Sequence, residues 1–255
     1  MGMTDKKRRK KRLWLRIAAV ILALALLGIM LFWLTLPDVS WLKKENPQET
    51  AMMRFRAEQA AQKGRKPRRL WKRVPLSHIS PFLIQAVLIA EDDKFFEHEG
   101  FDWASMRQAL EANIEKKHVR RGGSTITQQL AKNLFLNPGQ NVWRKLREAA
   151  IAVKLEKVLS KKRILELYLN LIEWGDDIYG AEAAARVYFR CPAASLSLSQ
   201  AVRLASVLPN PHSFAAKASN NRRMNRKRKI IALRMLRRRW INQSAFDQAL
   251  AEMEI

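Results

Sequence analysis

The pattern of apolar and polar residues changes abruptly near the N-terminus. Residues 6–12 are seven consecutive cations, whereas residues 17–36 contain no charged side chain. A helix of about twenty residues rises about 30 Å, which matches the hydrocarbon core of a bilayer. Trp14 and Trp33 lie near the two ends, where indole rings favour the membrane interface. The pattern predicts a membrane-spanning helix over residues 17–36, preceded by a basic tail over residues 1–16.

A cleaved signal peptide is the alternative interpretation of this apolar segment. Its apolar region would be shorter, and small residues should mark a cleavage site. Residues 34–38, Leu-Thr-Leu-Pro-Asp, offer no such site. Because cations next to a spanning helix stay on the cytoplasmic side, we expect a single-pass protein of the cytoplasmic (inner) membrane. Its N-terminus would lie in the cytoplasm, and the residues after Pro37 would lie outside.

The stretch after the anchor is interrupted by prolines and a glycine, so residues 37–75 are expected to form a connecting region. Within it, residues 49–66 have few apolar positions and predict a solvated helix that packs weakly. Further on, apolar residues recur at helical spacing and strand-like alternation is scarce. We therefore expect a mostly α-helical domain over residues 76–250.

Helices in this domain are predicted where apolar spacing coincides with cap or turn residues. Ser80 and Pro81 form a typical start, with serine as the N-cap and proline in the first turn. A second helix should open after the glycines at 122–123, and residues 173–180 are expected to be a loop. Further helical segments are expected at 142–159, 161–170, 181–189, 196–208 and, as a basic amphipathic helix, 222–239.

The net charge of the chain is +25, which indicates an anionic partner. Nucleic acid, anionic lipid and a phosphorylated substrate all fit the charge, but a domain outside the cytoplasm argues against nucleic acid. The single cysteine, Cys191, excludes an intramolecular disulfide and a cysteine-cluster metal site. The four histidines lack the close pairing of a zinc helix motif. No metal site is therefore predicted.

Acidic residues are concentrated in one segment of this basic chain, because six of the 23 lie at 91–102. Glu91 follows Val87 by four residues and Ile84 by seven, so it continues the apolar face of its helix. Partial burial raises the pKa of a carboxyl group, which suits a general base. The alternative is a helix-end acid paired with a neighbouring cation.

Two further segments combine polar side chains that could handle an anion. Residues 122–129, Gly-Gly-Ser-Thr-Ile-Thr-Gln-Gln, open a helix whose N-terminus could hold a phosphate, or they form a glycine turn before a capped helix. In the next helix, Glu148 continues an apolar stripe and follows Arg144 by four residues and Lys145 by three. That spacing forms either an anion-binding cluster with its own acid or two ordinary helix ion pairs.

Taken in order, these segments resemble the motifs of the peptidoglycan glycosyltransferases. Residues 91–102 match the first motif, E-D-x-x-F-x-x-H-x-G-x-D, and residues 122–129 match the second. The remaining blocks lie at 144–148 with its continuation to 170, at 175–189 and at 204–211, so that the resemblance covers about residues 76–240. One departure is Asp177, which occupies the second glycine position of a Gly-x-Gly in the fourth block.

The resemblance implies a lysozyme-like, mostly α-helical glycosyltransferase domain with a small mobile lobe near the membrane. The chain has no room for a transpeptidase domain after this region, so it is similar to the monofunctional members. These polymerise lipid II on the outer face of the membrane through β-1,4 bonds, with inversion, and release undecaprenyl diphosphate. The expected partners are lipid II, the growing lipid-linked glycan and the membrane, with cell-wall or division proteins as further candidates. No cofactor is required, although a divalent cation (Mg²⁺ or Mn²⁺) can assist.

The resemblance also implies roles for single residues. Glu91 would be the general base, and Glu148 would orient the neighbouring cations or assist the donor phosphate. The substrate-binding residues would be Lys132, Arg144 and Lys145 at the diphosphate, Ser124, Thr125 and Gln129 on the donor side, and Asp92, Phe95 and His98 around the base.

Three other functions remain open from the sequence. Lysozyme-like hydrolases also use a glutamate, although the segment at 122–129 and its following cations favour a diphosphate donor. A membrane-tethered nucleic-acid binder would bind DNA in a salt-sensitive way, but it leaves the acidic segment unexplained. A non-enzymatic scaffold would have no need for Glu91 and Glu148.

Overall fold

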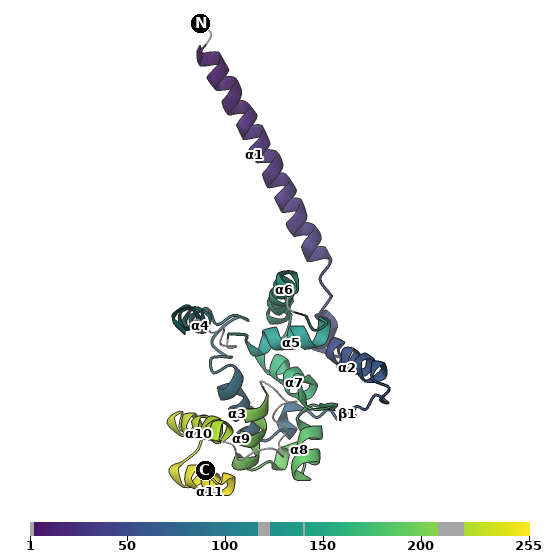
Figure 1. Ribbon diagram of the computed structural model, residues 1–255, viewed down its shortest axis with the longest axis vertical. Helices are drawn as coiled ribbons and strands as arrows, with labels where there is room; N and C mark the ends of the chain where they lie inside the picture. The colour runs from purple at the N-terminus through teal and green to yellow at the C-terminus, as the bar shows by residue number, and fades with distance from the viewer. Residues whose placement is uncertain (1–2, 117–122, 140, 209–221) are drawn as a thin grey trace. The chain divides into compact units, whose positions relative to one another are not determined.

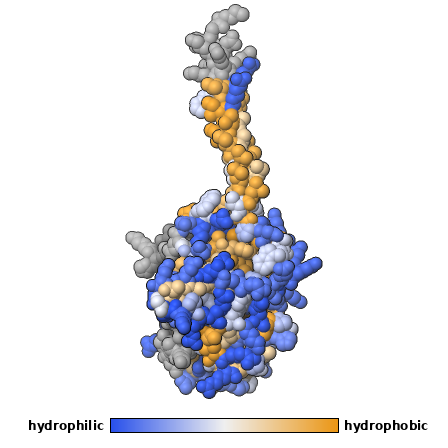
Figure 2. All heavy atoms as spheres, turned by 90° about the vertical axis from the view of Figure 1, so that its right-hand side faces the viewer, coloured by the Kyte–Doolittle hydropathy of each residue, from blue (hydrophilic) through white to orange (hydrophobic). Residues whose placement is uncertain are grey.

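The computed structural model describes residues 3–116, 123–139, 141–208 and 222–255 (Figure 1). The chain forms two compact units, Met1–Asp38 and Val39–Ile255. In the first unit, α1 (Met3–Leu34) contains a stretch from Arg12 to Leu34 with a mean hydropathy of 2.8 and none of its span buried. Figure 2 shows apolar side chains exposed along the face of the helix that is turned toward the viewer. The predicted apolar helix is confirmed, and it is long and apolar enough to cross a membrane.

The second unit is mostly helical, as predicted. Its helices are α2 (Ala51–Gln62), α3 (Pro81–Glu91), α4 (Trp103–Lys116), α5 (Ile126–Phe135), α6 (Val142–Val158), α7 (Lys161–Leu171), α8 (Ala181–Phe189), α9 (Leu198–Val207), α10 (Arg222–Arg237) and α11 (Gln243–Met253). Short 3₁₀ helices occupy Ser40–Lys43, Leu76–His78 and Ala193–Ser195. Gly122 and residues 209–211, the end of the family block at 204–211, lie outside the described residues.

One small sheet was not expected. Its strands are β1 (Leu70–Trp71), β2 (Glu173–Gly175) and β3 (Ile178–Tyr179), in the order β1-β3-β2, with β1 parallel and β2 antiparallel to β3. The prediction of a loop over residues 173–180 was therefore wrong in part, because β2 and β3 form a hairpin there. Strands of two or three residues are too short to produce an alternating pattern in the sequence.

Polar side chains define the ends of several helices. Thr125, at the start of α5, accepts a hydrogen bond from the backbone of Gln128, whose own side chain accepts from the backbone N–H of Thr125. Ser80 differs from the prediction: it precedes α3, but its hydroxyl makes no cap bond and instead donates to the carbonyl of Leu196 at 2.9 Å. Ser80 thus joins the start of α3 to the segment before α9.

Helix α2 is part of the packed unit. Residues from Val39 onward belong to the second unit, and α2 packs against α5. Met53 is only 2% exposed, and the guanidinium of Arg56 lies 3.2 Å from the carboxylate of Glu173. The expectation of a weakly packed helix over residues 49–66 was therefore wrong. Ala51, Met53 and Ala60 of α2 are all buried. The distant segments that cover them cannot be recognised from local sequence.

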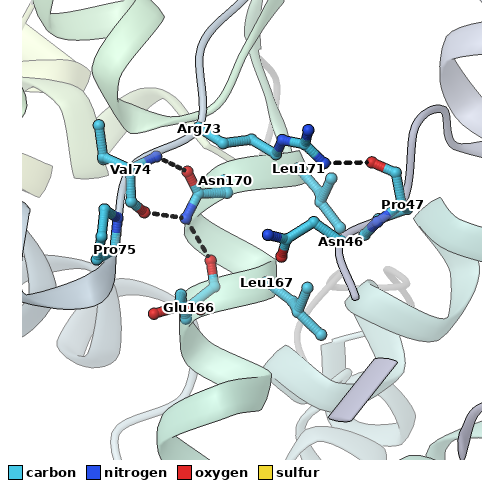
Figure 3. A pocket seen from close by; sticks show the side chains of 9 residues that line it. All are labelled: Asn46, Pro47, Arg73, Val74, Pro75, Glu166, Leu167, Asn170 and Leu171. Carbon is cyan, nitrogen blue, oxygen red and sulfur yellow. Dashed lines mark hydrogen bonds between the residues drawn. The ribbon is translucent and has the colours of Figure 1, made fainter. Parts of the chain in front are cut away.

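A second segment of the expected connecting region is held on α7. The Asn170 side chain accepts from the backbone N–H of Val74 and donates to its carbonyl, each at 2.9 Å (Figure 3). Arg73 donates to the carbonyl of Pro47 at 2.9 Å across a cavity of about 190 Å³. These bonds satisfy backbone groups that would otherwise need water, and they fix residues 73–75 against the helix that carries Tyr168.

The core that positions the site consists of two helix groups. Helix α3 packs against α9 and α10, and α5 packs against α6 and α7 (Figure 1). Leu83 and Val87 of α3, Leu130 of α5 and Tyr168 of α7 are completely buried. Burial of such side chains contributes about 1.5–3 kcal/mol each, so the polar ends of these helices are held in fixed positions.

Asp177 lies in the turn between β2 and β3 with a positive φ of 60°. This left-handed conformation is unfavourable for a residue with a Cβ and natural for glycine, which accounts for the glycine of the family motif. We expect Asp177→Gly to raise the free energy of unfolding by up to about 1 kcal/mol, because relief of strain is partly offset by the freedom of glycine in the unfolded chain. Thermal unfolding of the detergent-solubilised protein measures this change. A clear loss of stability would show that the aspartate side chain contributes more than its strain costs.

Candidate active site

Glu91 is the last residue of α3, where the apolar face of the helix meets the acidic segment. Its Oε2 accepts a hydrogen bond from Nε2 of Gln129 at 2.9 Å. Its Oε1 is buried and has no hydrogen-bond partner among the residues that the structure describes. Burial raises the pKa of Glu91, while the Gln129 bond and the charges of Lys227 and Lys132 lower it. A buried carboxylate oxygen without a partner is suited to accept a proton from a ligand.

The segment after Glu91 is tied to the start of α5 through Asp92. One oxygen of this buried carboxylate lies 2.9 Å from Nε2 of His98, and the other accepts the backbone N–H of Ile126 at 2.9 Å. The Thr125 hydroxyl donates to the carbonyl of Gly100 at 2.7 Å. Asp92 and His98 thus hold the segment in place. The N–H of Ile126 is already bonded, so in this part of α5 the geometry favours the capped-helix alternative over a phosphate site.

Phe95 lies beneath the same segment and is 1% exposed. Its ring packs edge-on against His98, and the ammonium of Lys161 lies 4.5 Å from the ring centre. The side chain therefore has little surface to offer a ligand. Its position fits the predicted role of shaping the surroundings of Glu91.

The second acid, Glu148, lies in α6 and is 3% exposed. Its carboxylate accepts from Nη1 of Arg144 at 2.9 Å and forms an ion pair with Lys145. The Lys145 ammonium also donates to the Ser124 hydroxyl at 3.1 Å. Nε of Arg144 is buried and has no hydrogen-bond partner among the described residues. The cluster therefore holds two oriented cations and retains a guanidinium N–H for an anionic ligand.

Lys132 connects the two acids electrostatically. It follows Gln129 by three residues in α5, which packs against α6. Burial lowers the pKa of Lys132, and the carboxylates of Glu148 and Glu91 both raise it. Opposite charges within a partly buried site interact over several ångströms. The ammonium group of Lys132 therefore interacts electrostatically with both Glu91 and Glu148.

A cavity of about 220 Å³ opens beside Glu91. Ser124 belongs to its lining and also contacts Lys145, so it joins the cavity to the Glu148 cluster. The other lining residues are Ile89, Ala90, Glu91, Asp92, Asp93, Asp102, Ser105, Gly123, Thr125 and Arg234. Ser124 thus links the cavity beside Glu91 to Lys145, the ion-pair partner of Glu148. Gln129 was predicted on the donor side, whereas its amide contacts Glu91.

The sequence analysis missed two residues of α10. Arg234 lines the cavity, and Lys227 lies close enough to Glu91 to lower its pKa. This helix was predicted only as a basic amphipathic surface. Lys227, Ile231 and Arg234 are spaced four and three residues apart, so they share one helix face. That spacing indicates from the sequence that the two cations share a face of α10. It does not show that this face is directed toward Glu91.

The arrangement combines a proton acceptor with a group of fixed cations. Such a pair can remove a proton from a hydroxyl group while a negatively charged leaving group departs. Among the described residues, no group of three or more His, Cys, Asp or Glu side chains is arranged to hold a metal ion.

The comparisons place this mostly helical protein among the enzymes that transfer glycosyl groups. The model of the transglycosylase family matches residues 57–236, which is more than half of the chain, and the chain belongs to this family. The match begins within α2, which the structure packs against α5.

Curated relatives match over most of the chain. Proteins named biosynthetic peptidoglycan transglycosylase are 47% identical in Azoarcus sp. over 80% of this chain and 88% of the relative, and 45% identical in Nitrosospira multiformis over 83% and 91%. The protein of that name from Laribacter hongkongensis is 45% identical over 86% of this chain and 95% of its own. Among solved structures, penicillin-binding protein 1A from Haemophilus influenzae is 23% identical, with a TM-score of 0.40 over 71% of this chain and 18% of its own.

Proposed function

We propose that this protein polymerises the glycan chains of peptidoglycan from lipid II. Family membership and the names of the relatives support glycosyl transfer in peptidoglycan synthesis. The observation that carries the mechanism is the buried, unpartnered Oε1 of Glu91 in a polar region shared with the cations around Glu148. A general base is needed to activate a sugar hydroxyl, and positive charge is needed to stabilise a departing diphosphate.

The proposed reaction is a direct displacement. The 4-hydroxyl oxygen of the acceptor GlcNAc forms a bond to C1 of the donor MurNAc, and its proton passes to Oε1 of Glu91. The bond between C1 and the phosphate oxygen breaks, and the undecaprenyl diphosphate leaves with the electron pair. An α-linked diphosphate becomes a β-1,4 glycoside, so the configuration inverts without a glycosyl-enzyme intermediate.

The cations near Glu148 stabilise the leaving group in this reaction. Lys132, Arg144 and Lys145 hold the diphosphate, with the unpaired N–H of Arg144 as one donor. Glu148 orients Arg144 and Lys145 through its two ion pairs. Gln129 holds Oε2 of Glu91, which leaves Oε1 for the acceptor. The displacement, with the proton taken up by Glu91, needs no cofactor.

The apolar helix α1 fits a single-pass anchor in the cytoplasmic membrane. We place the N-terminal cations in the cytoplasm and Val39–Ile255 outside it, because positive charges are retained on the inner side. Both substrates carry polyprenyl chains in the same membrane. Holding the enzyme at that surface raises the effective concentration of both. Cell-wall or division proteins are further proposed partners.

The deciding assay incubates the full-length protein in detergent with labelled lipid II, with and without Mg²⁺ or Mn²⁺. We expect polymer on a gel and release of undecaprenyl diphosphate. A parallel incubation with finished cell wall should yield no soluble fragments. Fragments from the cell wall without polymer from lipid II would instead identify a hydrolase. Salt-sensitive DNA binding without either product would favour the nucleic-acid binder.

A further inference from the structure

Helix α10 contributes Arg234 to the lining of the cavity beside Glu91. It packs against both α3 and α9, and its inner face buries Met224, Ile231 and Met235. At its C-terminal end, the guanidinium of Arg238 lies 2.9 Å from the carboxylate of Asp93, two residues after Glu91. The helix is therefore fixed to the segment that carries the proposed base.

Lys227 is held on this helix by a specific contact. Its Nζ donates to the carbonyl of Ser206 in α9 at 2.8 Å, and its side chain is only partly exposed. Arg234 lies seven residues later on the same face and lines the cavity beside Glu91. The face of α10 that carries Lys227 is thus directed toward Glu91.

The charged and titratable groups around Glu91 come from four elements. They are Lys132 of α5, Tyr168 of α7, Lys227 and Arg234 of α10, and Asp92 with the cavity-lining Asp93 and Asp102 of the acidic segment. Gln129 adds a neutral hydrogen bond. Two of the cations, Lys132 and Lys227, offset the burial of the Glu91 carboxylate.

These two lysines differ in what else they contact. Lys132 is also under the influence of Glu148, Arg144 and Lys145, and it is one of the groups proposed to hold the diphosphate. For Lys227, burial lowers the pKa, and Glu91 is the acid among the described residues that raises it. A donor diphosphate would engage Lys132 and reduce its effect on Glu91, whereas Lys227 would keep its charge and its bond to Ser206.

We propose that Lys227 is a positioning residue for the base, supplying from α10 a fixed positive charge that keeps Glu91 ionised while the donor diphosphate occupies Lys132. This inference rests on the proposed function. After each addition Glu91 carries the acceptor proton, and it must lose that proton before the next cycle. A protonated ammonium group nearby favours this loss, so the requirement for Lys227 is greatest at low pH.

The test compares pH profiles of lipid II polymerisation for Lys227→Gln and Lys227→Arg. We expect the glutamine variant to lose about three- to tenfold in kcat at the acid end of the profile. Its kcat on the alkaline plateau and its KM for lipid II should stay close to those of the wild type. The arginine variant keeps the charge and should restore the acid limb. Lys229→Gln, on the exposed side of α10, is the matched control and should follow the wild type.

Different outcomes separate this inference from the proposed function. An unchanged pH profile for Lys227→Gln, with an active wild type, would overturn the role of Lys227 and leave the polymerase intact. An equal loss at every pH, not restored by arginine, would show that Lys227 is structural or binds substrate. If the glutamine variant is poorly folded by circular dichroism, Lys227→Met provides a second neutral side chain. Absence of polymer from the wild type would reject the proposed function itself.

Discussion

Replacing Glu91 with glutamine is expected to lower the rate of glycan polymerisation by about 10²- to 10⁴-fold. The amide has nearly the shape of the carboxylate but cannot accept the proton of the acceptor hydroxyl. The loss should appear in kcat, because the base removes the proton of the acceptor hydroxyl in the transition state. Polymer formation from labelled lipid II under single-turnover and steady-state conditions measures the effect.

The same variant should remain folded. Glu91 is partly buried, and desolvation is the main cause that raises its pKa, so a neutral amide at this position removes a partly desolvated charge. The amide oxygen can still accept the hydrogen bond from Gln129. Glu97→Gln is a matched control, because Glu97 is an exposed acid in the same segment. Turnover near the wild-type rate in Glu91→Gln would reject the assignment of the base.

The pH dependence of the wild type follows from the same group. The base must be ionised, so activity is present above the pKa of Glu91 and is lost as the pH falls through it. Since burial raises this pKa above the ordinary value of a glutamate, activity should decline at a higher pH than for an exposed carboxylate. This acid limb should disappear in Glu91→Gln, where only residual turnover remains.

Replacing Glu148 with glutamine is expected to lower turnover by about 100-fold and the free energy of unfolding by about 2 kcal/mol. The carboxylate is 3% exposed and is paired with Arg144 and Lys145. A neutral amide leaves these cations without their buried counter-charge, so they repel each other and lose the orientation proposed for the diphosphate. Steady-state kinetics and thermal unfolding of the solubilised protein measure the two losses.

A control separates the site from an ordinary helix pair. Arg107 and Glu111 in α4 form an i, i+4 pair like Arg144 and Glu148, but both side chains are largely exposed. Glu111→Gln should therefore change stability by no more than about 0.5 kcal/mol. Full turnover in Glu148→Gln would mean that the cations bind the donor without this acid. A loss of stability with unchanged turnover would make Glu148 a structural residue.

Several features could be predicted because their physical cause is local. The apolar character of α1 and the position of Glu91 at the end of an apolar stripe follow from residues a few places apart. The cluster of Arg144, Lys145 and Glu148 is likewise a consequence of helical spacing, since residues three or four apart share a face. The family motifs added an order to these segments, but they did not show which side chains touch.

Other features could not be predicted because they depend on contacts between distant segments. Gln129 donates to Glu91, and Ser80 bonds Leu196 rather than capping α3. Strands of two or three residues carry no periodic signal, so the sheet was missed. In the sequence, Lys227 cannot be distinguished from the other cations of a basic helix. Its proximity to Glu91 results from the packing of α10 against α3.

The sequence by itself determined the N-terminal apolar helix, the helical class and the two acids, because these depend on hydrophobicity and on spacing along a single helix. Only the tertiary structure decided that α5 supplies Gln129 and Lys132 to Glu91, that Ser124 links its cavity to the Glu148 cluster, and that α10 closes the site with Lys227 and Arg234. The reason is that burial and electrostatic coupling depend on distances in space, and the packing of separate helices sets those distances.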